Sequence, residues 1–314
     1  MVVAVVGPTA TGKSGLGVAL AKALGGEVVN ADSMQLYRGM DIGTAKLTTA
    51  EQDGVPHHLL DVWPVTETAS VAAYQRLARA AVDALRAAGR VPILVGGSGL
   101  YVDAVLDRME FPGTDPVLRA ALEAELAAEG PAPLYARLTA ADPAAAAAIL
   151  PSNGRRIVRA LEVIALTGSF TAELPSDPQP YYPAVRIGLD RPVDELDVRV
   201  EQRVDLMWAA GLVDEVRALE REGLREGRTA SRALGYAQIL RMFDGALDEP
   251  GAITATQAAT RRFVRRQRSW FRRDGRVRWL DATDERQVLV DALALVHQGS
   301  QQLAREAGDN PRRI

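Results

Sequence analysis

The sequence has no cysteine and only three histidines among its 314 residues. The absence of cysteine excludes a disulfide framework, a thiolate nucleophile and a zinc site with cysteine ligands. Three histidines argue against a histidine-rich metal site as well. His57 and His58 are interpreted as loop histidines without chemistry, because no third ligand accompanies them, and their role stays open.

Long apolar runs are also absent, and none approaches the ~18 residues that a membrane span needs. The opening segment MVVAVVG is broken by Gly7-Pro8 too early to serve as a signal peptide. With 47% hydrophobic and 25% charged residues, the composition is that of an ordinary globular protein. We therefore expect a cytoplasmic protein that does not enter a membrane.

Lysine is scarce, because only Lys13, Lys22 and Lys46 stand among 37 basic residues. Arginine is concentrated instead: residues 261–278 hold nine arginines and a single acid, Asp274. That segment carries +8 in a chain whose net charge is −3, so the remainder carries −11. Such a concentrated basic patch predicts a polyanionic partner, the alternative being a solvated helix face.

The hydrophobic pattern of the first hundred residues predicts an α/β fold. Runs of aliphatic residues predict buried strands at Val2–Val6, Glu27–Asn30 and Val91–Val95. Helical periodicity predicts helices over Lys13–Leu24 and Ala69–Ala88, both followed by glycine. Alternation of strands and helices at these spacings is typical of a doubly wound parallel sheet.

The pattern changes after Phe111-Pro112-Gly113. Helical signals alone follow from Asp115 to Gly168, and a proline-rich stretch covers 175–183. A strand returns at Val185–Leu189, so we predict a core domain of residues 1–111 and 185–314 with a helical insertion over 112–184. The later elements expected are helices at 196–222 (interrupted at Gly211), 255–273 and 286–297, a strand at 277–280, and a frayed tail at 308–314.

The strongest motif follows the first strand and opens the first helix. It matches G-x-x-x-x-G-K-[ST] and consists of Gly7, Pro8, Thr9, Ala10, Thr11, Gly12, Lys13 and Ser14. In such a loop the backbone N–H groups and the lysine bind the phosphates of a nucleotide or another diphosphate, and the serine hydroxyl can ligate Mg²⁺. The predicted fold is thus a P-loop NTPase-like α/β domain with a helical insertion.

The position of the acids distinguishes between phosphate chemistries. An ATPase or kinase usually has a strand that ends in a Mg²⁺-binding acid, whereas Val91–Val95 leads into Gly-Gly-Ser98-Gly. The acid follows the second strand instead, as Asp32. Because ligands bind at the carboxyl ends of parallel strands, Asp32 is a candidate general base, the alternative being an Asx turn or helix cap.

Several segments together resemble the bacterial tRNA dimethylallyltransferase (IPP transferase) family, in order and at its spacing over about residues 2 to 280. Two departures are Ser98, where the family more often has threonine, and Leu47, where it usually has proline after Lys46. The segments that carry the resemblance are 7–14, 30–37, 41–46, 56–61, 95–101, 153–162, 232–236 and 266–272.

The resemblance implies transfer of a dimethylallyl group from dimethylallyl diphosphate to N6 of adenosine 37 in tRNA, with release of diphosphate. It implies that the phosphate loop binds the prenyl diphosphate with Mg²⁺ rather than ATP. Asp32 is then the base, and Ser98 and Arg232 assist the departing diphosphate. We also expect a monomer. Because cysteine is absent, we expect no C-terminal zinc finger of the kind that eukaryotic relatives often have.

Contacts with the anticodon stem-loop are predicted from the resemblance and the basic clusters, in both domains. Within the arginine-rich helix an apolar stripe (Phe263, Val264, Gln267, Trp270, Phe271) would face the core while the arginines face outward. The predicted tRNA-binding residues are Asp32, Ser33, Met34, Gln35, Arg155, Arg156, Arg159, Gly235, Tyr236, Arg265, Arg266, Gln267, Arg268, Trp270 and Arg272.

Three other functions are weighed against this prediction. A small-molecule kinase shares the phosphate loop and Mg²⁺, but has no need of an arginine-rich segment. An enzyme that prenylates free adenine nucleotides likewise has little use for RNA-facing clusters. A non-catalytic RNA-binding switch would bind GTP or ATP without forming a product.

Overall fold

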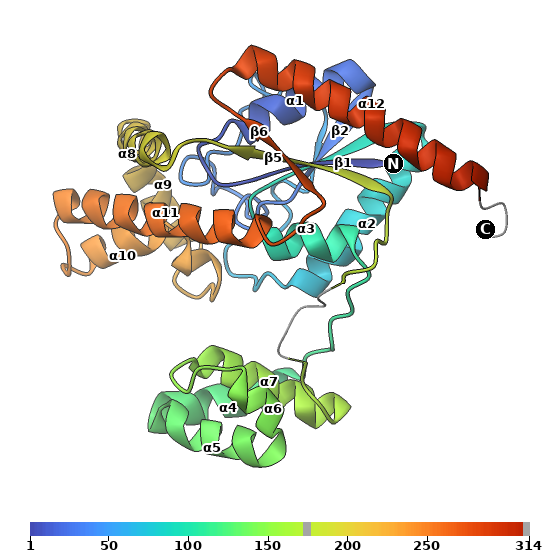
Figure 1. The fold of residues 1–314 in the computed structure, drawn as a ribbon. Coiled ribbons are helices and arrows are strands. Elements are labelled where there is room, and N and C mark those ends of the chain that lie inside the picture. Colours follow the sequence, from blue (N-terminus) through green and yellow to red (C-terminus); the bar gives the residue numbers. More distant parts are fainter. Residues whose placement is uncertain (172–176, 310–314) are drawn as a thin grey trace. The chain divides into compact units, whose positions relative to one another are not determined.

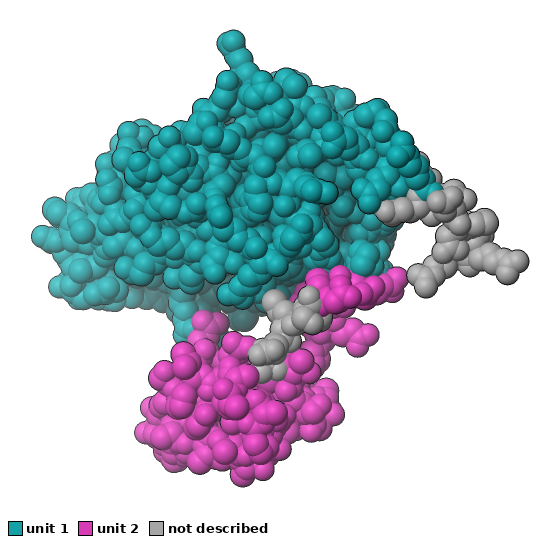
Figure 2. Space-filling model, viewed as in Figure 1, with its two compact units in different colours: residues 1–107, 180–314 teal, residues 108–179 magenta. Residues whose placement is uncertain are grey.

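The computed structural model describes residues 1–171 and 177–309. The chain forms two compact units, Met1–Asp107 with Pro180–Ile314, and Arg108–Gln179 (Figure 2). The unit boundaries thus lie four or five residues before the predicted ones at 112 and 184. Part of the predicted proline-rich stretch, residues 175 and 176, lies outside the described residues.

Unit 1 is built on a six-stranded sheet in which every pair of neighbouring strands is parallel (Figure 1). The strand order is β3-β2-β4-β1-β5-β6, which confirms the doubly wound α/β prediction. The two-residue strand β3 was not predicted. The strands are β1 (Val2–Val6), β2 (Gly26–Asn30), β3 (His57–His58), β4 (Val91–Val95), β5 (Ala184–Asp190) and β6 (Val277–Asp281).

Helices cover both faces of this sheet (Figure 1). On one face, α1 (Lys13–Leu24) and α12 (Glu285–Asp309) pack against Val3 and Val5 of the central strand. On the other, α2 (Val71–Ala87) and α3 (Gly99–Leu106) pack with Val2, Ala4 and Val6. The first strand is therefore buried on both sides, as its unbroken aliphatic run predicts.

A third group of helices lies in unit 1, and most of them share a core of leucine, valine and tyrosine side chains. Helix α11 begins six residues earlier than predicted, because Asp248 caps it and accepts a hydrogen bond from Gly251 N at 2.9 Å. Helix α10 was not predicted. The group comprises α8 (Val193–Ala209), α9 (Leu212–Arg221), the 3₁₀ turn η1 (Ala230–Arg232), α10 (Tyr236–Phe243) and α11 (Glu249–Phe271).

Unit 2 is wholly helical, as predicted for the insertion. Its helices are α4 (Pro116–Glu129), α5 (Pro131–Ala141), α6 (Pro143–Ala147) and α7 (Gly154–Thr167). The first three begin with proline, whose fixed φ suits the first helical turn. Buried leucine and isoleucine side chains from α4, α5 and α7 form a separate core, so the unit has a hydrophobic centre of its own.

The C-terminal helix α12 is longer than predicted and includes residues 308 and 309 of the expected frayed tail. The rest of that tail, residues 310–314, lies outside the described residues. None of the helices in the described part of the chain is long and apolar enough to cross a membrane.

Candidate active site

The phosphate loop connects β1 to α1 in a conformation that requires glycine at two positions. Gly7 and Gly12 have φ of 131° and 90°, values that L-residues rarely adopt. A Cβ on Gly7 would also lie 2.3 Å from the carbonyl oxygen of Leu189. Thr11 closes the loop, since its hydroxyl donates to Pro8 O at 2.9 Å. The loop therefore packs against β5 and directs its backbone toward the start of α1.

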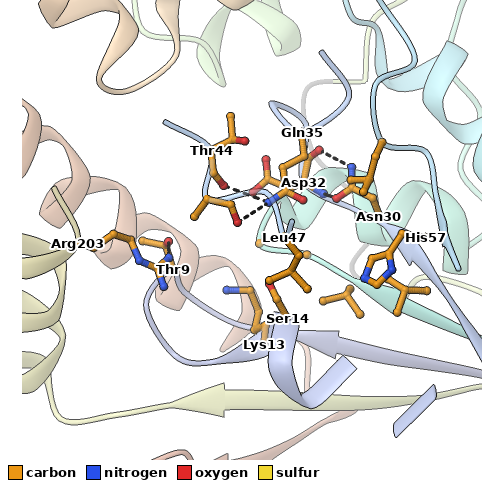
Figure 3. Close-up of a pocket in the computed structure, with 16 residues that line it drawn as sticks. Thr9, Lys13, Ser14, Asn30, Asp32, Gln35, Thr44, Leu47, His57 and Arg203 are labelled. Carbon is orange, nitrogen blue, oxygen red and sulfur yellow. Dashed lines mark hydrogen bonds between the residues drawn. The ribbon is translucent and has the colours of Figure 1, made fainter. Parts of the chain in front are cut away.

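A pocket opens beside this loop, at the carboxyl ends of β2 and β4 (Figure 3). Its polar side chains include Lys13, Ser14, Asp32 and Arg203, and its apolar wall includes Leu47. One pocket thus combines cations, a carboxylate and an apolar surface. All lining residues are Thr9, Lys13, Ser14, Val28, Asn30, Asp32, Gln35, Thr44, Ala45, Leu47, His57, Leu60, Val95, Gly96, Gly97 and Arg203.

Lys13 places its amine in this pocket, where the protonated form of the amine is disfavoured. Burial and, second to it, the neighbouring charge of Arg203 lower the pKa of its amine to about 7, while Asp32 opposes the shift. Its Nζ donates to the carbonyl of Pro8 at 2.5 Å. A buried amine of low pKa beside a second cation is stabilised by a bound anion, which is the ligand that the loop motif predicts.

Asp32 is held in place by the side chain of Asn30, which bridges the turn after β2. Asn30 Oδ1 accepts from Asp32 N at 2.8 Å, and Asn30 Nδ2 donates to the carbonyl oxygens of Asp32 and Leu59, both at 3.0 Å. Asp32 Oδ1 accepts from Met34 N at 3.0 Å, so the Asx-turn alternative is also present in the structure. Burial raises the pKa of the Asp32 carboxyl against the effect of Met34 N–H and Lys13, which makes the carboxylate a better base.

Ser98 lies next to the pocket without lining it. Its Oγ accepts a hydrogen bond from Ser33 N at 3.1 Å and lies 3.2 Å from the Ser33 hydroxyl oxygen. These contacts tie the turn after β4 to the turn that carries Asp32. A role of Ser98 at the leaving diphosphate stays a prediction, whereas its support of the Asp32 turn is visible in these contacts.

Arg232 is exposed on η1 and is not among the pocket-lining residues. The structure does not bring it beside Lys13 and Asp32. The arginine that does line the pocket, Arg203 of α8, was missed, as was its neighbour Arg199. Their spacing of four residues, which places both on one helix face, was the available signal. It does not by itself indicate a site, because helical arginines are usually solvent-exposed.

Three of the predicted tRNA-contacting arginines, two on α11 and one directly after it, pair with aspartates of the protein. Arg265 binds Asp197 of α8, with Nη2 2.8 Å from Oδ2, and Arg268 and Arg272 both bind Asp190 at the end of β5. Arg265 and Arg272 are exposed, as expected for arginines that face outward, while Arg268 is partly buried. Arg266 is exposed, and its guanidinium carbon lies 5.6 Å from the centroid of the Phe263 ring.

Four other predicted tRNA-binding residues have contacts within unit 1, and their contact with tRNA stays a prediction. Gln267 is buried, accepts from Thr9 N and donates to Gly97 O, both at 2.9 Å. The indole of Trp270 donates to Asp103 Oδ2 at 2.9 Å. Gly235 and Tyr236 are buried at the start of α10, where the tyrosine hydroxyl donates to Glu215 at 2.5 Å.

The basic cluster of unit 2 divides in the same way. Arg155 and Arg156 are exposed at the start of α7. Arg159 instead donates to the buried carboxylate of Glu162 at 2.7 Å and to the carbonyl oxygen of Pro112, also at 2.7 Å. Of the three arginines in this cluster, Arg155 and Arg156 are therefore the exposed ones.

The loop of residues 41–47, part of which lines the pocket, is anchored by a buried lysine. Lys46, whose side chain is 6% exposed, pairs with Asp41 and with Asp61 at 2.6 Å. Glu215 of α9 accepts from the backbone N–H of Ile42 at 2.7 Å. Lys46 thus has a structural role that the sequence left open, and the change from proline to Leu47 leaves this anchoring intact.

His57 and His58 form strand β3 and do not lie in a loop as expected. No group of three or more histidine and acidic side chains suited to a metal occurs in residues 1–171 and 177–309. His57 lines the pocket, and burial lowers its pKa. His58 binds Glu27 at 2.7 Å.

A model of the family described as IPP transferase matches residues 35–274. The chain belongs to this family. A Salinispora arenicola protein named tRNA dimethylallyltransferase is 71% identical over 296 residues, which cover 94% of this chain and 86% of the relative. A Thermobifida fusca protein of the same name is 65% identical over 315 residues, covering 98% of this chain and 97% of the relative.

Solved structures of IPP transferases have the same architecture. The full-length tRNA isopentenylpyrophosphate transferase of Bacillus halodurans matches with a TM-score of 0.73 at 41% identity, covering 97% of this chain and 98% of that one. A eukaryotic dimethylallyltransferase acting on tRNA matches with a TM-score of 0.76 at 25% identity, covering 100% of this chain and 80% of that one.

Proposed function

We propose that this chain transfers a dimethylallyl group from dimethylallyl diphosphate to N6 of adenosine 37, next to the anticodon of tRNA, and releases diphosphate. The observation that carries the proposal is one pocket that contains both a phosphate loop and a carboxylate of raised pKa, Asp32. Membership of the IPP transferase family supports the same reaction.

The residues of the pocket divide the chemistry between them. The phosphate loop and Lys13 bind the diphosphate, which leaves with its bonding electron pair when the C1–O bond breaks. The exocyclic amine of adenosine forms the new C–N bond, and Asp32 takes the proton that the amine must lose. The apolar wall with Leu47 and Val28 offers a surface for the prenyl chain.

Mg²⁺ is part of the proposal, and the donors of the site fit it. Ser14 presents a hydroxyl to the pocket, while the described residues offer no cluster of three acidic or histidine ligands. Mg²⁺ suits such a site because it usually keeps several waters and binds substrate phosphates with few protein ligands. When bound, it would neutralise charge on the departing diphosphate.

For tRNA we propose contact through the exposed arginines, Arg266 on α11 and Arg155 and Arg156 on α7. A base in an anticodon loop can be flipped into a pocket at lower cost than one in a duplex. A monomer that acts on tRNA in the cytoplasm completes this proposal.

Incubation with labelled dimethylallyl diphosphate and four acceptors in parallel tests the function. The acceptors are unmodified tRNA, the same tRNA with guanosine at position 37, AMP and no acceptor. We expect label only in the unmodified tRNA. Label in AMP would indicate an enzyme for free nucleotides, and conversion of ATP to ADP without prenyl transfer would indicate a kinase.

A further inference from the structure

Glu215 of α9 binds the loop of residues 41–47 with both oxygens of its carboxylate. Its Oε2 accepts from the backbone N–H groups of Asp41 at 3.1 Å and Ile42 at 2.7 Å. Its Oε1 accepts from the N–H of Gly43 at 3.3 Å. Successive backbone N–H groups that converge in this way form a site for an anion. One side chain of a distant helix therefore fixes the first three residues of the loop.

Tyr236 of α10 holds both Glu215 and the loop in place. Its hydroxyl donates to Glu215 Oε1 at 2.5 Å. Its ring lies so close to Gly43 that a Cβ at this position would be 2.5 Å from the ring. The tyrosine is completely buried in the core that α9 and α10 share. Any side chain larger than hydrogen at residue 43 would therefore push the loop away from these helices.

The charge of Glu215 makes these hydrogen bonds strong. Hydrogen bonds to an ionised acceptor are roughly twice as strong as those between neutral groups. Glu215 also stands in the first turn of α9, where the positive end of the helix dipole favours a carboxylate. The anchor of the loop is therefore an ionised group whose own position is fixed by a helix.

The other end of the loop forms part of the pocket. Thr44, Ala45 and Leu47 line it, and Gln35 Nε2 donates to the carbonyl oxygen of Thr44 at 3.1 Å (Figure 3). Thr44 follows directly after the three anchored residues, so the anchor sets where this wall of the pocket lies. The phosphate loop is held separately, between β1 and α1 and against β5. The two parts of the pocket therefore have different supports.

We propose that Glu215 is a positioning residue that acts through the loop of residues 41–47 on the organic part of the diphosphate substrate. It keeps Thr44 and Leu47 where they contact the chain attached to the diphosphate, while the phosphate loop binds the phosphates. That this chain is a dimethylallyl group rests on the proposed function, whereas the anchoring of the pocket wall does not.

Calorimetry with two diphosphates and Mg²⁺, in the absence of tRNA, tests this assignment. Dimethylallyl diphosphate occupies both parts of the pocket, whereas methyl diphosphate has the same charged group with a single carbon. We expect Glu215→Gln to weaken binding of dimethylallyl diphosphate about tenfold, the equivalent of one lost hydrogen bond, and to leave methyl diphosphate within about twofold of wild type. The matched control is Glu220→Gln on the same helix, which removes an ion pair with Arg225 and should change neither affinity.

Equal weakening of both ligands in a folded Glu215→Gln variant would overturn the proposal, and so would unchanged affinity for both. If that variant melts below the assay temperature, Tyr236→Phe decides, because it removes the hydroxyl that donates to Glu215 and keeps the ring against Gly43. A loss in Tyr236→Phe that is absent for dimethylallyl diphosphate, or equal for both ligands, would then overturn it. Failure of the proposed function is separate: wild-type protein would bind dimethylallyl diphosphate without prenylating tRNA.

Discussion

The low pKa of Lys13 predicts that diphosphate binding draws a proton from solution. In the free protein, burial and Arg203 lower this pKa from the ordinary 10.5 to about 7. A bound diphosphate would raise the pKa of Lys13 again, because its negative charge favours the protonated amine. At a pH above 7, ligand and proton must therefore bind together.

The number of protons follows from the pKa. About one tenth of Lys13 is protonated at pH 8 in the free protein and nearly all in the complex, so binding should take up about 0.9 proton at pH 8 and about 0.1 at pH 6. Affinity should accordingly fall about tenfold per pH unit above 7. The terminal phosphate loses its second proton near pH 6, with a pKa of about 6, so the ligand itself contributes little at pH 8.

The proton count can be measured as the dependence of the binding heat on the ionisation enthalpy of the buffer. Dimethylallyl diphosphate would be titrated at pH 8 and fixed Mg²⁺ into the wild-type protein and a Lys13→Arg variant. Arginine stays charged at this pH, so proton uptake should nearly vanish in the variant. Uptake below about 0.3 proton in the wild type, or equal uptake in both proteins, would refute the reasoning.

Three further predictions concern other residues. Asp32→Ala should lower single-turnover prenyl transfer by ~10²–10⁴ while tRNA affinity survives; near-normal turnover would remove the base assignment. Arg266→Ala should reduce the slope of log K for tRNA binding against log[salt] by ~0.7–0.9. Arg265→Ala should change this slope less, because the Arg265 guanidinium group already binds Asp197. Equal changes of slope in the two variants would contradict this prediction. Trp270→Ala should cost about 3 kcal/mol in urea unfolding, since a large ring packed on Gly99 is lost; a loss of tRNA affinity without destabilisation would place Trp270 at the RNA interface.

Most of the α/β core could be predicted from local signals. Helix α1 has the predicted bounds because a phosphate loop starts it and Gly25 ends it with φ of 63°. The short strand β3 gives no such signal, since two histidines have no alternating pattern and pair with β2 through tertiary contact alone. Helix α10 was missed because its start depends on the positive φ of Gly235.

The site was predictable where the motif is local and unpredictable where it depends on distant segments. Lys13, Ser14 and Asp32 meet in one pocket, as their positions after β1 and β2 require. Gln267 contacts Thr9 across 258 positions, and Arg203 contacts it across 194. Nothing in the neighbourhood of either residue in the sequence distinguishes it from an ordinary helical glutamine or arginine.

The arginine-rich segment shows how a count of charges misleads when its counterions lie elsewhere in the chain. Five of its nine arginines pair with acids: Arg261, Arg265, Arg268, Arg272 and Arg276. Among the described residues, the four without a carboxylate partner are Arg262, Arg266, Arg273 and Arg278, so the charge available to RNA is nearer +4 than +8. The paired arginines fix α11 against α8 and β5, and this placement brings Gln267 to Thr9 of the phosphate loop. Part of the positive charge therefore positions α11 beside the phosphate loop, and the proposed contact with RNA is left to the four arginines without a carboxylate partner.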